Sequence, residues 1–206
     1  MMPTHDAVVL AAGGSHRLGQ PKQLLTRDGE TLVRRCVRLA LETAPRRLLV
    51  IVGGHAEAVT AAVRDLPMDI LPNPAWEEGL ASSLRLAAAT LVSGRADASP
   101  ACLLLACDQP ALEAAHLDAL REGFVARGCA ATRHGDGRGV PAWAPADLLA
   151  QAASLQGDRG LRGLLAARAP ECIALLDAPE LTHDIDTPED LREARRRGWI
   201  DPAPDC

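Results

Sequence analysis

The feature that most constrains the fold is an alternation of short apolar runs with segments of helical periodicity. Three runs are hydrophobic on both faces, as strands buried in a parallel sheet are. They lie at residues 7–12, 48–52 and 102–106. Apolar side chains recur at helical spacing in residues 30–43, 55–65 and 78–91. Strands that alternate with helices form βαβ units, so the sequence predicts an α/β fold of three layers around a mostly parallel sheet.

The second half of the chain is less regular, but it shows no linker and no internal repeat. We predict helices at 113–127, after Pro145, at 158–168 and from Thr187 onward. We predict strands at 129–132 and 172–176, a short segment of unassigned type at 140–143, and loops at 93–100 and 133–139. The tail after residue 198 is expected to fray. We therefore expect a single domain over residues 1–206.

Composition limits the class of molecule. The chain has 206 residues, 48% hydrophobic and 24% charged, which is enough to bury one core. Its 22 Lys and Arg against 27 Asp and Glu give a net charge of −5, whereas nucleic-acid-binding proteins usually carry a basic excess. No apolar run approaches the length of a membrane span, and no signal-peptide pattern opens the chain. We expect a cytoplasmic protein with neither nucleic acid nor membrane as partner.

One loop combines glycines with the only lysine of the chain. It reads Gly13-Gly14-Ser15-His16-Arg17-Leu18-Gly19-Gln20-Pro21-Lys22, while the other 21 basic residues are arginines. Glycines let backbone N–H groups surround a phosphate, and Arg17 and Lys22 would supply the countercharge. An ammonium and a guanidinium are not interchangeable, so Lys22 is a candidate for a chemical role. The loop has neither the Walker A nor the GxGxxG pattern, and an ordinary strand-to-helix turn is the alternative.

Carboxylates occur at two places where a divalent cation could bind. Asp108 follows the apolar run at 102–106, so its carboxylate would project from a strand end where desolvation is costly without a cation. Mg²⁺ suits such a place, because it takes one or two carboxylates with phosphate oxygens and water. Asp184 and Asp186 form a second pair on one side of an extended segment. The alternatives are a solvated turn for Asp108 and, for one of the pair, support of the following helix.

Two serine hydroxyls and the loops at the ends of the predicted strands are further candidates for the site. Ser82 and Ser83, early in the predicted helix at 78–91, could read the polar edge of a base, or they are helix-end or surface hydroxyls. In an open parallel sheet the ligand binds outside the carboxyl ends of the strands, at a change in strand order. The loops that leave such ends are 13–22, 53–55, 73–79 and 108–110. We expect these loops to meet at one rim.

Several segments, taken in order, match one family pattern. They are Leu10-Ala11-Ala12 with the loop to Lys22, residues 73–84 (NPAWEEGLASSL), residues 107–110 (CDQP), residues 157–162 (GDRGLR) and residues 184–191 (DIDTPEDL). The first is similar to the signature loop LAAGxSxRxGxxK, and the third to a metal-binding DQP turn. Together they resemble the molybdenum cofactor cytidylyltransferase family over about residues 8–191.

This resemblance implies a Rossmann-like nucleotidyltransferase sheet and transfer of CMP from CTP to the terminal phosphate of molybdopterin, with release of pyrophosphate. It implies catalytic roles for Arg17, Lys22 and Asp108, and a Mg²⁺ site at Asp108 with Asp186 or Asp184. The implied nucleotide-binding residues are Leu10, Ala11, Ala12, Gly13, Gly14, Ser15, Gly79, Ser82 and Ser83. This chain has Leu-Ala-Ala-Gly at the start of the loop, where the guanylyl branch of the family has Leu-Ala-Gly-Gly. The resemblance therefore favours a pyrimidine base. A molybdenum hydroxylase or its maturation factor is the implied protein partner.

Two departures from the pattern leave alternatives open. Leu18 replaces a usual Met, and Arg138-Gly139-Val140-Pro141 stands where the family commonly has Gly-His-Pro, a change that concerns how the second substrate is held. One alternative is an accessory or carrier protein for molybdenum hydroxylase maturation, without turnover. Another is a nucleotidyltransferase that acts on a different phosphomonoester such as a sugar phosphate. A nucleotide-dependent oxidoreductase is disfavoured because the GxGxxG pattern is missing.

Overall fold

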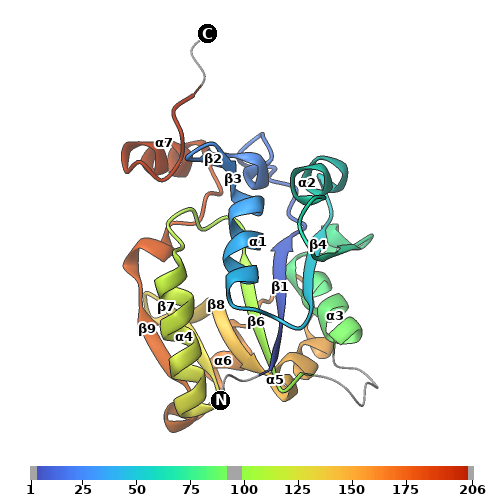
Figure 1. The fold of residues 1–206 in the computed structure, drawn as a ribbon, viewed down its shortest axis with the longest axis vertical. Coiled ribbons are helices and arrows are strands. Elements are labelled where there is room, and N and C mark those ends of the chain that lie inside the picture. The colour runs from blue at the N-terminus through green and yellow to red at the C-terminus, as the bar shows by residue number, and fades with distance from the viewer. Residues whose placement is uncertain (1–3, 92–98, 204–206) are drawn as a thin grey trace.

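A seven-stranded sheet forms the centre of the molecule, and helices cover both of its faces (Figure 1). The computed structural model describes residues 4–91 and 99–203. Most of the predicted loop at 93–100 lies outside this part of the chain. Across the described residues, no helix is both long and apolar enough to cross a membrane.

The strands and helices follow the predicted alternation. The strands are β1 (His5–Ala11), β2 (Thr26–Arg27), β3 (Glu30–Thr31), β4 (Leu48–Val52), β5 (Asp69–Pro72), β6 (Ala101–Ala106), β7 (Ala130–His134), β8 (Gly137–Pro145) and β9 (Ala174–Asp177). The helices are α1 (Leu32–Glu42), α2 (Ala56–Val63), α3 (Leu80–Leu91), α4 (Ala114–Arg127), α5 (Ala146–Gln151), α6 (Arg162–Ala166) and α7 (Pro188–Arg196). Short 3-10 turns at Lys22–Leu24 and Trp76–Glu78 lie beside the candidate site.

The strand order explains where a ligand can bind. The sheet runs β5-β4-β1-β6-β8-β7-β9, with β1 parallel to both β4 and β6. The chain first builds the sheet outward from β1 to β4 and β5, and it then returns to add β6 on the other side of β1. This is the change in strand order at which open α/β sheets bind ligands. Among the described strands of this sheet, β8 alone runs antiparallel to its neighbours, so the expected mostly parallel sheet is confirmed.

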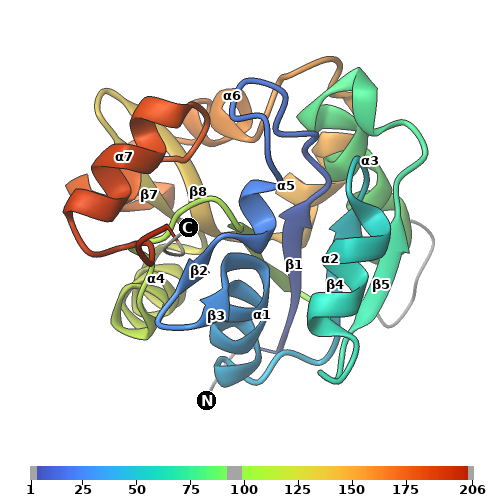
Figure 2. The same ribbon diagram turned by 90° about the horizontal axis from the view of Figure 1, so that it is seen from above.

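Helices lie on both faces of the sheet (Figure 2), and a hydrophobic layer packs between the sheet and the helices on each face. Alternate residues of β1 point to opposite faces, with Val9 in one layer and Val8 in the other. Helices α1, α2 and α4 cover the Val9 face, and α3, α5 and α6 cover the Val8 face. The chain is therefore a single α/β domain of three layers, as expected from runs that are apolar on both faces.

The segment predicted as a loop at 133–139 is instead most of a β-hairpin. His134 pairs with Gly137 and Arg133 with Arg138, and β8 runs on to Pro145 through the short segment at 140–143. Gly135 turns the chain with a φ of 56°, a left-handed conformation that glycine adopts without strain. The polar side chains that indicated a loop face the solvent or the candidate site from strand positions. The helix predicted at 158–168 is likewise shorter and begins at Arg162.

The expectation of a frayed tail after residue 198 is wrong for residues 199–201. Ile200 is buried in a small cluster with Leu18 and Leu25. The Asp201 carboxylate accepts hydrogen bonds from the backbone N–H groups of Asp28 (2.8 Å) and Gly29 (2.9 Å), in the turn between β2 and β3. The C-terminal segment thus closes over the β2–β3 ribbon beside α7 (Figure 1).

Candidate active site

A cavity of about 1100 Å³ opens at the carboxyl ends of β1 and β6. It lies where the strand order changes, and the loops expected to meet at one rim all contribute to it except residues 53–55. Its lining residues are 10–17, 22–23, 76–77, 79–80, 83–84, 106–109, 134–135, 137–140, 158, 160–162, 182, 184 and 186. Single small-ligand pockets measure roughly 300–1,000 Å³, so this cavity has room for a nucleotide and a second molecule.

The glycine-bearing loop is held by side chains inside it. Gln23, almost fully buried, donates from Nε2 to the carbonyl oxygens of Ala11 (3.1 Å) and Gly13 (2.7 Å). The hydroxyl of Ser15 accepts a hydrogen bond from the backbone N–H of Lys22 at 3.2 Å, which closes the loop on itself. Ser15 has a φ of 53°, an uncommon left-handed value for a residue with a side chain. The loop conformation is therefore specified locally, before any ligand arrives.

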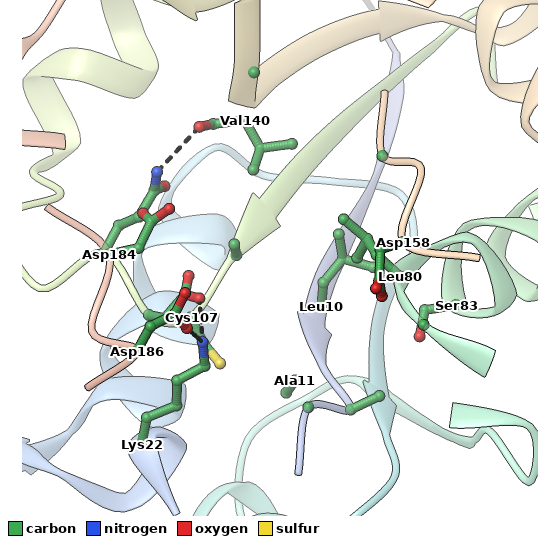
Figure 3. Close-up of a pocket in the computed structure, with 18 of the residues that line it drawn as sticks. Leu10, Ala11, Lys22, Leu80, Ser83, Cys107, Val140, Asp158, Asp184 and Asp186 are labelled. Atoms are coloured by element: carbon green, nitrogen blue, oxygen red, sulfur yellow. Dashed lines mark hydrogen bonds and ion pairs between the residues drawn. The ribbon is translucent and has the colours of Figure 1, made fainter. Parts of the chain in front are cut away.

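Four charged residues form one cluster at the edge of the cavity, which we call the Lys22 cluster: Arg17, Lys22, Asp108 and Asp186. Lys22 Nζ donates to Asp108 Oδ2 and to Asp186 Oδ1, both at 2.7 Å. Arg17 Nη2 donates to Asp186 Oδ2 at 2.8 Å. Figure 3 shows Lys22 and Asp186 on one side of the cavity and Leu10, Leu80 and Ser83 on the other. The structure brings the three predicted catalytic residues together.

The Lys22 cluster is electrically balanced, with two cations against two carboxylates in a partly buried place. Burial alone would lower the pKa of the Lys22 ammonium, but the charges and hydrogen bonds of Asp108 and Asp186 outweigh it and hold that pKa above its usual value. Asp184 lies close by, and burial, together with the charge of Asp108, raises the pKa of its carboxyl to about 7. The Asp184 carboxyl is thus only partly ionised near neutral pH, and a cation bound beside it would favour its charged form.

These carboxylates could hold a divalent cation only if a bound ligand supplied further oxygen atoms. Within residues 4–91 and 99–203, no three His, Cys, Asp or Glu side chains converge closely enough to hold a metal by themselves. Asp108 and Asp186 nevertheless face one ammonium, and Asp184 adds a third, partly protonated carboxyl. Two carboxylates completed by phosphate oxygens and water are a donor set that Mg²⁺ accepts. The residues fit a cation that is bound together with a nucleotide.

The two predicted base-reading serines differ in their surroundings. The amide of Asn73 donates to the hydroxyl oxygens of Ser82 (2.8 Å) and Ser83 (3.1 Å). The Ser82 hydroxyl in turn donates to the carbonyl oxygen of Gly79 at 2.8 Å, and Ser82 does not line the cavity. Ser83 does line it, and among the described residues its hydroxyl proton has no acceptor. Ser83 is therefore free to meet a ligand, whereas Ser82 ties the loop to α3.

Every predicted site residue except Ser82 lines the cavity. The lining residues to which the sequence analysis gave no role include His16, Trp76, Gln109, His134, Asp158 and Arg162. Asp158 and Arg162 belong to the GDRGLR stretch, so the motif match carried a signal for them. Trp76 likewise lies in the matched stretch at 73–84, and Gln109 in the CDQP turn. His134 has no such signal, because it is a lone residue that only the tertiary fold brings to the cavity.

Comparison with known proteins identifies the family. The model of the MobA-like NTP transferase domain matches residues 7–172, so the chain belongs to this family of nucleotidyltransferases. The family resemblance carried by the motifs is thereby confirmed.

Relatives along the whole chain carry different names. The nicotine blue oxidoreductase of Paenarthrobacter nicotinovorans is 29% identical over 92% of this chain and 96% of its own length. The molybdenum cofactor cytidylyltransferase of Escherichia coli K12 is 26% identical over 95% of this chain and 98% of its own. A probable molybdenum cofactor guanylyltransferase of Opitutus terrae is 31% identical over 77% of this chain and 76% of its own.

Solved structures share the fold. Rv0371c of Mycobacterium tuberculosis H37Rv superposes with a TM-score of 0.75 at 30% identity, over 94% of this chain and 98% of that one. A complex of Rv0371c with manganese gives a TM-score of 0.71 at 28% identity, over 92% and 97% of the two chains. The α/β nucleotidyltransferase fold is thus established, while the names of the relatives differ in the chemistry they state.

Proposed function

We propose that this protein transfers CMP from CTP to the terminal phosphate of molybdopterin and releases pyrophosphate, with Mg²⁺ as the metal. The observation that carries the proposal is the Lys22 cluster at the switch point of the sheet, beside a loop built to expose backbone N–H groups. The molybdenum cofactor cytidylyltransferase relative, similar over nearly the whole chain, supports the choice of substrates.

The chain's own residues would perform the reaction by positioning and charge. Backbone N–H groups of the loop at 13–19 would hold the triphosphate, with Arg17 and Lys22 against the β and γ phosphates. An oxygen of the acceptor phosphate attacks the α-phosphorus in line, and the bond from that phosphorus to the bridging oxygen of pyrophosphate breaks. The acceptor phosphate is already ionised near neutral pH, so no strong general base is required. Catalysis of this kind depends on orientation and stabilisation of charge.

Asp108 and Asp186, with Asp184 nearby, are the residues that would hold Mg²⁺, which would neutralise phosphate charge when bound. The base would lie on the opposite side, against Leu10, Ala11 and Ser83. Ala12 in Leu-Ala-Ala-Gly adds a methyl group where a second glycine would leave more room, which favours the smaller pyrimidine.

Incubation with each of the four nucleoside triphosphates, Mg²⁺ and molybdopterin tests the proposal. We expect pyrophosphate release with CTP above all, and a product that carries cytosine. Isothermal titration with CTP and GTP in the presence of Mg²⁺ should give the tighter binding to CTP. Tighter binding of GTP would reverse the assignment of the base while leaving nucleotidyl transfer intact.

The same assay separates the alternatives. Tight molybdopterin binding without pyrophosphate release would favour a carrier without turnover. Release with a sugar phosphate in place of molybdopterin would favour another phosphomonoester as acceptor. Because one relative is named an oxidoreductase, the assay includes NADPH with a quinone-like acceptor. Loss of NADPH absorbance without pyrophosphate release would overturn the proposed function.

A pair of adjacent substitutions tests the assignment of the base side. Ser83→Ala removes a hydroxyl that lines the cavity, so we expect CTP affinity to fall about fivefold, the value of one hydrogen bond of about 1 kcal/mol. Ser82→Ala removes a bond within the protein and is expected to lower the free energy of unfolding by about 1 kcal/mol. Titration of CTP and chemical denaturation measure the two effects. Equal losses of CTP affinity in both variants would contradict the distinction.

A further inference from the structure

The wall of the cavity contributed by the β7–β8 hairpin and residues 158–162 has no part in the mechanism described above. It carries two arginines, Arg138 and Arg162, and the imidazole of His134. The Lys22 cluster belongs to other segments, the loop after β1, the turn after β6 and the segment before α7. A reaction between two anions needs a second cationic subsite, because the acceptor phosphate and the triphosphate repel each other.

The three arginines that line the cavity differ in what they already bind. Arg17 is paired with Asp186. Arg138 donates from Nη1 to the carbonyl oxygens of Leu165 (2.8 Å) and Arg168 (3.2 Å), so it ties β8 to α6. Arg162 has no hydrogen-bond or ion-pair partner among the described residues, and its side chain lines the cavity. Arg162 is thus the cavity arginine with its donors available to a ligand.

The position of Arg162 depends on a glycine. A Cβ atom at Gly137, the first residue of β8, would lie 2.8 Å from Arg162 Cζ and Nε and 2.9 Å from Nη2. The guanidinium therefore rests directly on the backbone of β8, in space that any side chain at position 137 would take. Gly137 is buried whereas Arg162 is exposed, so the guanidinium covers this glycine while the rest of it stays accessible to a ligand.

A second polar ring lies next to this contact. The imidazole of His134 covers Gly139, where a Cβ atom would lie 2.9 Å from its Cδ2. His134 Nε2 is 2.7 Å from the carbonyl oxygen of Val140, which can only accept, so Nε2 carries the proton. That bond fixes the ring on the hairpin. Arg162 and His134 thus sit over alternate glycines of the same strand.

The other end of the Arg162 segment is attached to the base side of the cavity. The backbone N–H of Ala81 donates to the carbonyl oxygen of Gly157 at 3.0 Å. Gly79, with a φ of 97°, lies against Asp158, where a Cβ atom would be 2.3 Å from Oδ1. The segment 157–162 therefore spans from the start of α3 to β8, and it sets the place of Arg162 relative to the nucleotide.

We propose that Arg162, seated on Gly137 with His134 beside it, binds the phosphate of the acceptor, and that the acceptor is a phosphomonoester dianion. The inference rests on the proposed nucleotidyl transfer and adds the subsite of its second substrate. A guanidinium binds phosphate through two parallel N–H···O bonds, which orient as well as attract it. The third oxygen of the phosphate remains free to form the bond to the α-phosphorus as the bond to pyrophosphate breaks.

Substitutions at two positions test this subsite. Arg162→Gln removes the charge, and Gly137→Ala keeps the charge but displaces the guanidinium, since the new Cβ needs its space. Arg159→Gln is the matched control: Arg159 is an exposed arginine of the same segment that does not line the cavity. With the protein saturated with Mg²⁺ and a non-reactive CTP analogue, anaerobic isothermal titration with molybdopterin measures acceptor binding.

We expect Arg162→Gln and Gly137→Ala each to weaken molybdopterin binding by about tenfold or more, as the loss of a charge-assisted bond implies. The double variant should bind no more weakly than Arg162→Gln alone, because both changes remove one contact. The affinity of all variants for CTP, and the acceptor affinity of Arg159→Gln, should match those of the unmodified protein. An unchanged acceptor affinity in Arg162→Gln, or an equal loss in Arg159→Gln, overturns the proposal.

The same titrations distinguish an error in the proposed function from an error in the proposed subsite. If the unmodified protein does not bind molybdopterin, the choice of acceptor is wrong, and inorganic phosphate becomes the probe of the subsite. Phosphate affinity that falls in Arg162→Gln but not in Arg159→Gln then supports an anion site at Arg162 for another phosphomonoester. Equal phosphate affinity in both variants overturns it.

Discussion

Lys22→Arg is expected to lower kcat by about a hundredfold or more, although the substitution keeps the positive charge. The Lys22 ammonium is 2.7 Å from both Asp108 and Asp186, and only 15% of its side chain is exposed. A guanidinium is wider and holds its donors in a planar fork, so it cannot take this place without moving a carboxylate. The displaced charges would no longer meet the leaving pyrophosphate where charge develops.

The measurement is pyrophosphate release at saturating CTP and acceptor, together with the melting temperature. Arg34→Lys is a suitable control, because it exchanges the same two residue types at an ion pair with Asp65 that lies outside the cavity. We expect that control to retain its rate, and Lys22→Arg to melt within a few degrees of the unmodified protein. A rate close to normal in Lys22→Arg would show that Lys22 supplies only a charge.

The order of strands and helices in the first half of the chain follows from hydrophobic pattern alone. β1, β4 and β6 are apolar on both faces because helices cover both faces of the sheet. Such strands form continuous hydrophobic runs, and these can be recognised in the sequence without tertiary information. Strands of this kind need cover on both faces, which is typical of parallel sheets in α/β proteins. The prediction of three layers therefore depended on few assumptions, and the structure agrees with it.

The hairpin of β7 and β8 was missed because its signal is weak in the sequence. Arg133, His134 and Arg138 are polar, and glycines interrupt the segment, as in an ordinary loop. In the structure, polar residues occur at these strand positions because one side of the hairpin forms the cavity wall and not the core. A strand that faces a polar site does not show the alternation of buried and exposed residues on which period-two predictions depend.

The candidate site was also predictable only in part from the sequence. Lys22, Asp108 and Asp186 were predictable because each follows a strand or opens a helix, and loops at one edge of a sheet must meet. Ser82 was grouped with Ser83 because sequence gives only their helix position. Their roles differ because the Asn73 amide donates to both hydroxyls, whereas the carbonyl of Gly79 accepts a hydrogen bond from Ser82. Such partners across a turn are not visible in residue spacing.

Asp108→Asn is expected to reduce the rate of pyrophosphate release by at least a hundredfold and to make the remainder insensitive to Mg²⁺. The amide keeps the size of the carboxylate but loses the charge that a divalent cation requires. Stability should change little, because Asp186 still neutralises Lys22 at 2.7 Å. The hydrogen bond from the Ile185 N–H to the Asp108 carbonyl oxygen involves only backbone atoms and remains.

A titration of rate against Mg²⁺ concentration, with the melting temperature of each variant, measures both expectations. Asp65→Asn is the matched control, since it removes an equivalent charge from an ion pair with Arg34 outside the cavity. The charge of Asp108 also helps to raise the pKa of Asp184 to about 7, so Asp108→Asn should lower that pKa. A carbon NMR titration of the carboxyl groups detects this shift. Loss of folding in Asp108→Asn would instead assign Asp108 a structural role, and an undiminished response to Mg²⁺ would remove it from the metal site.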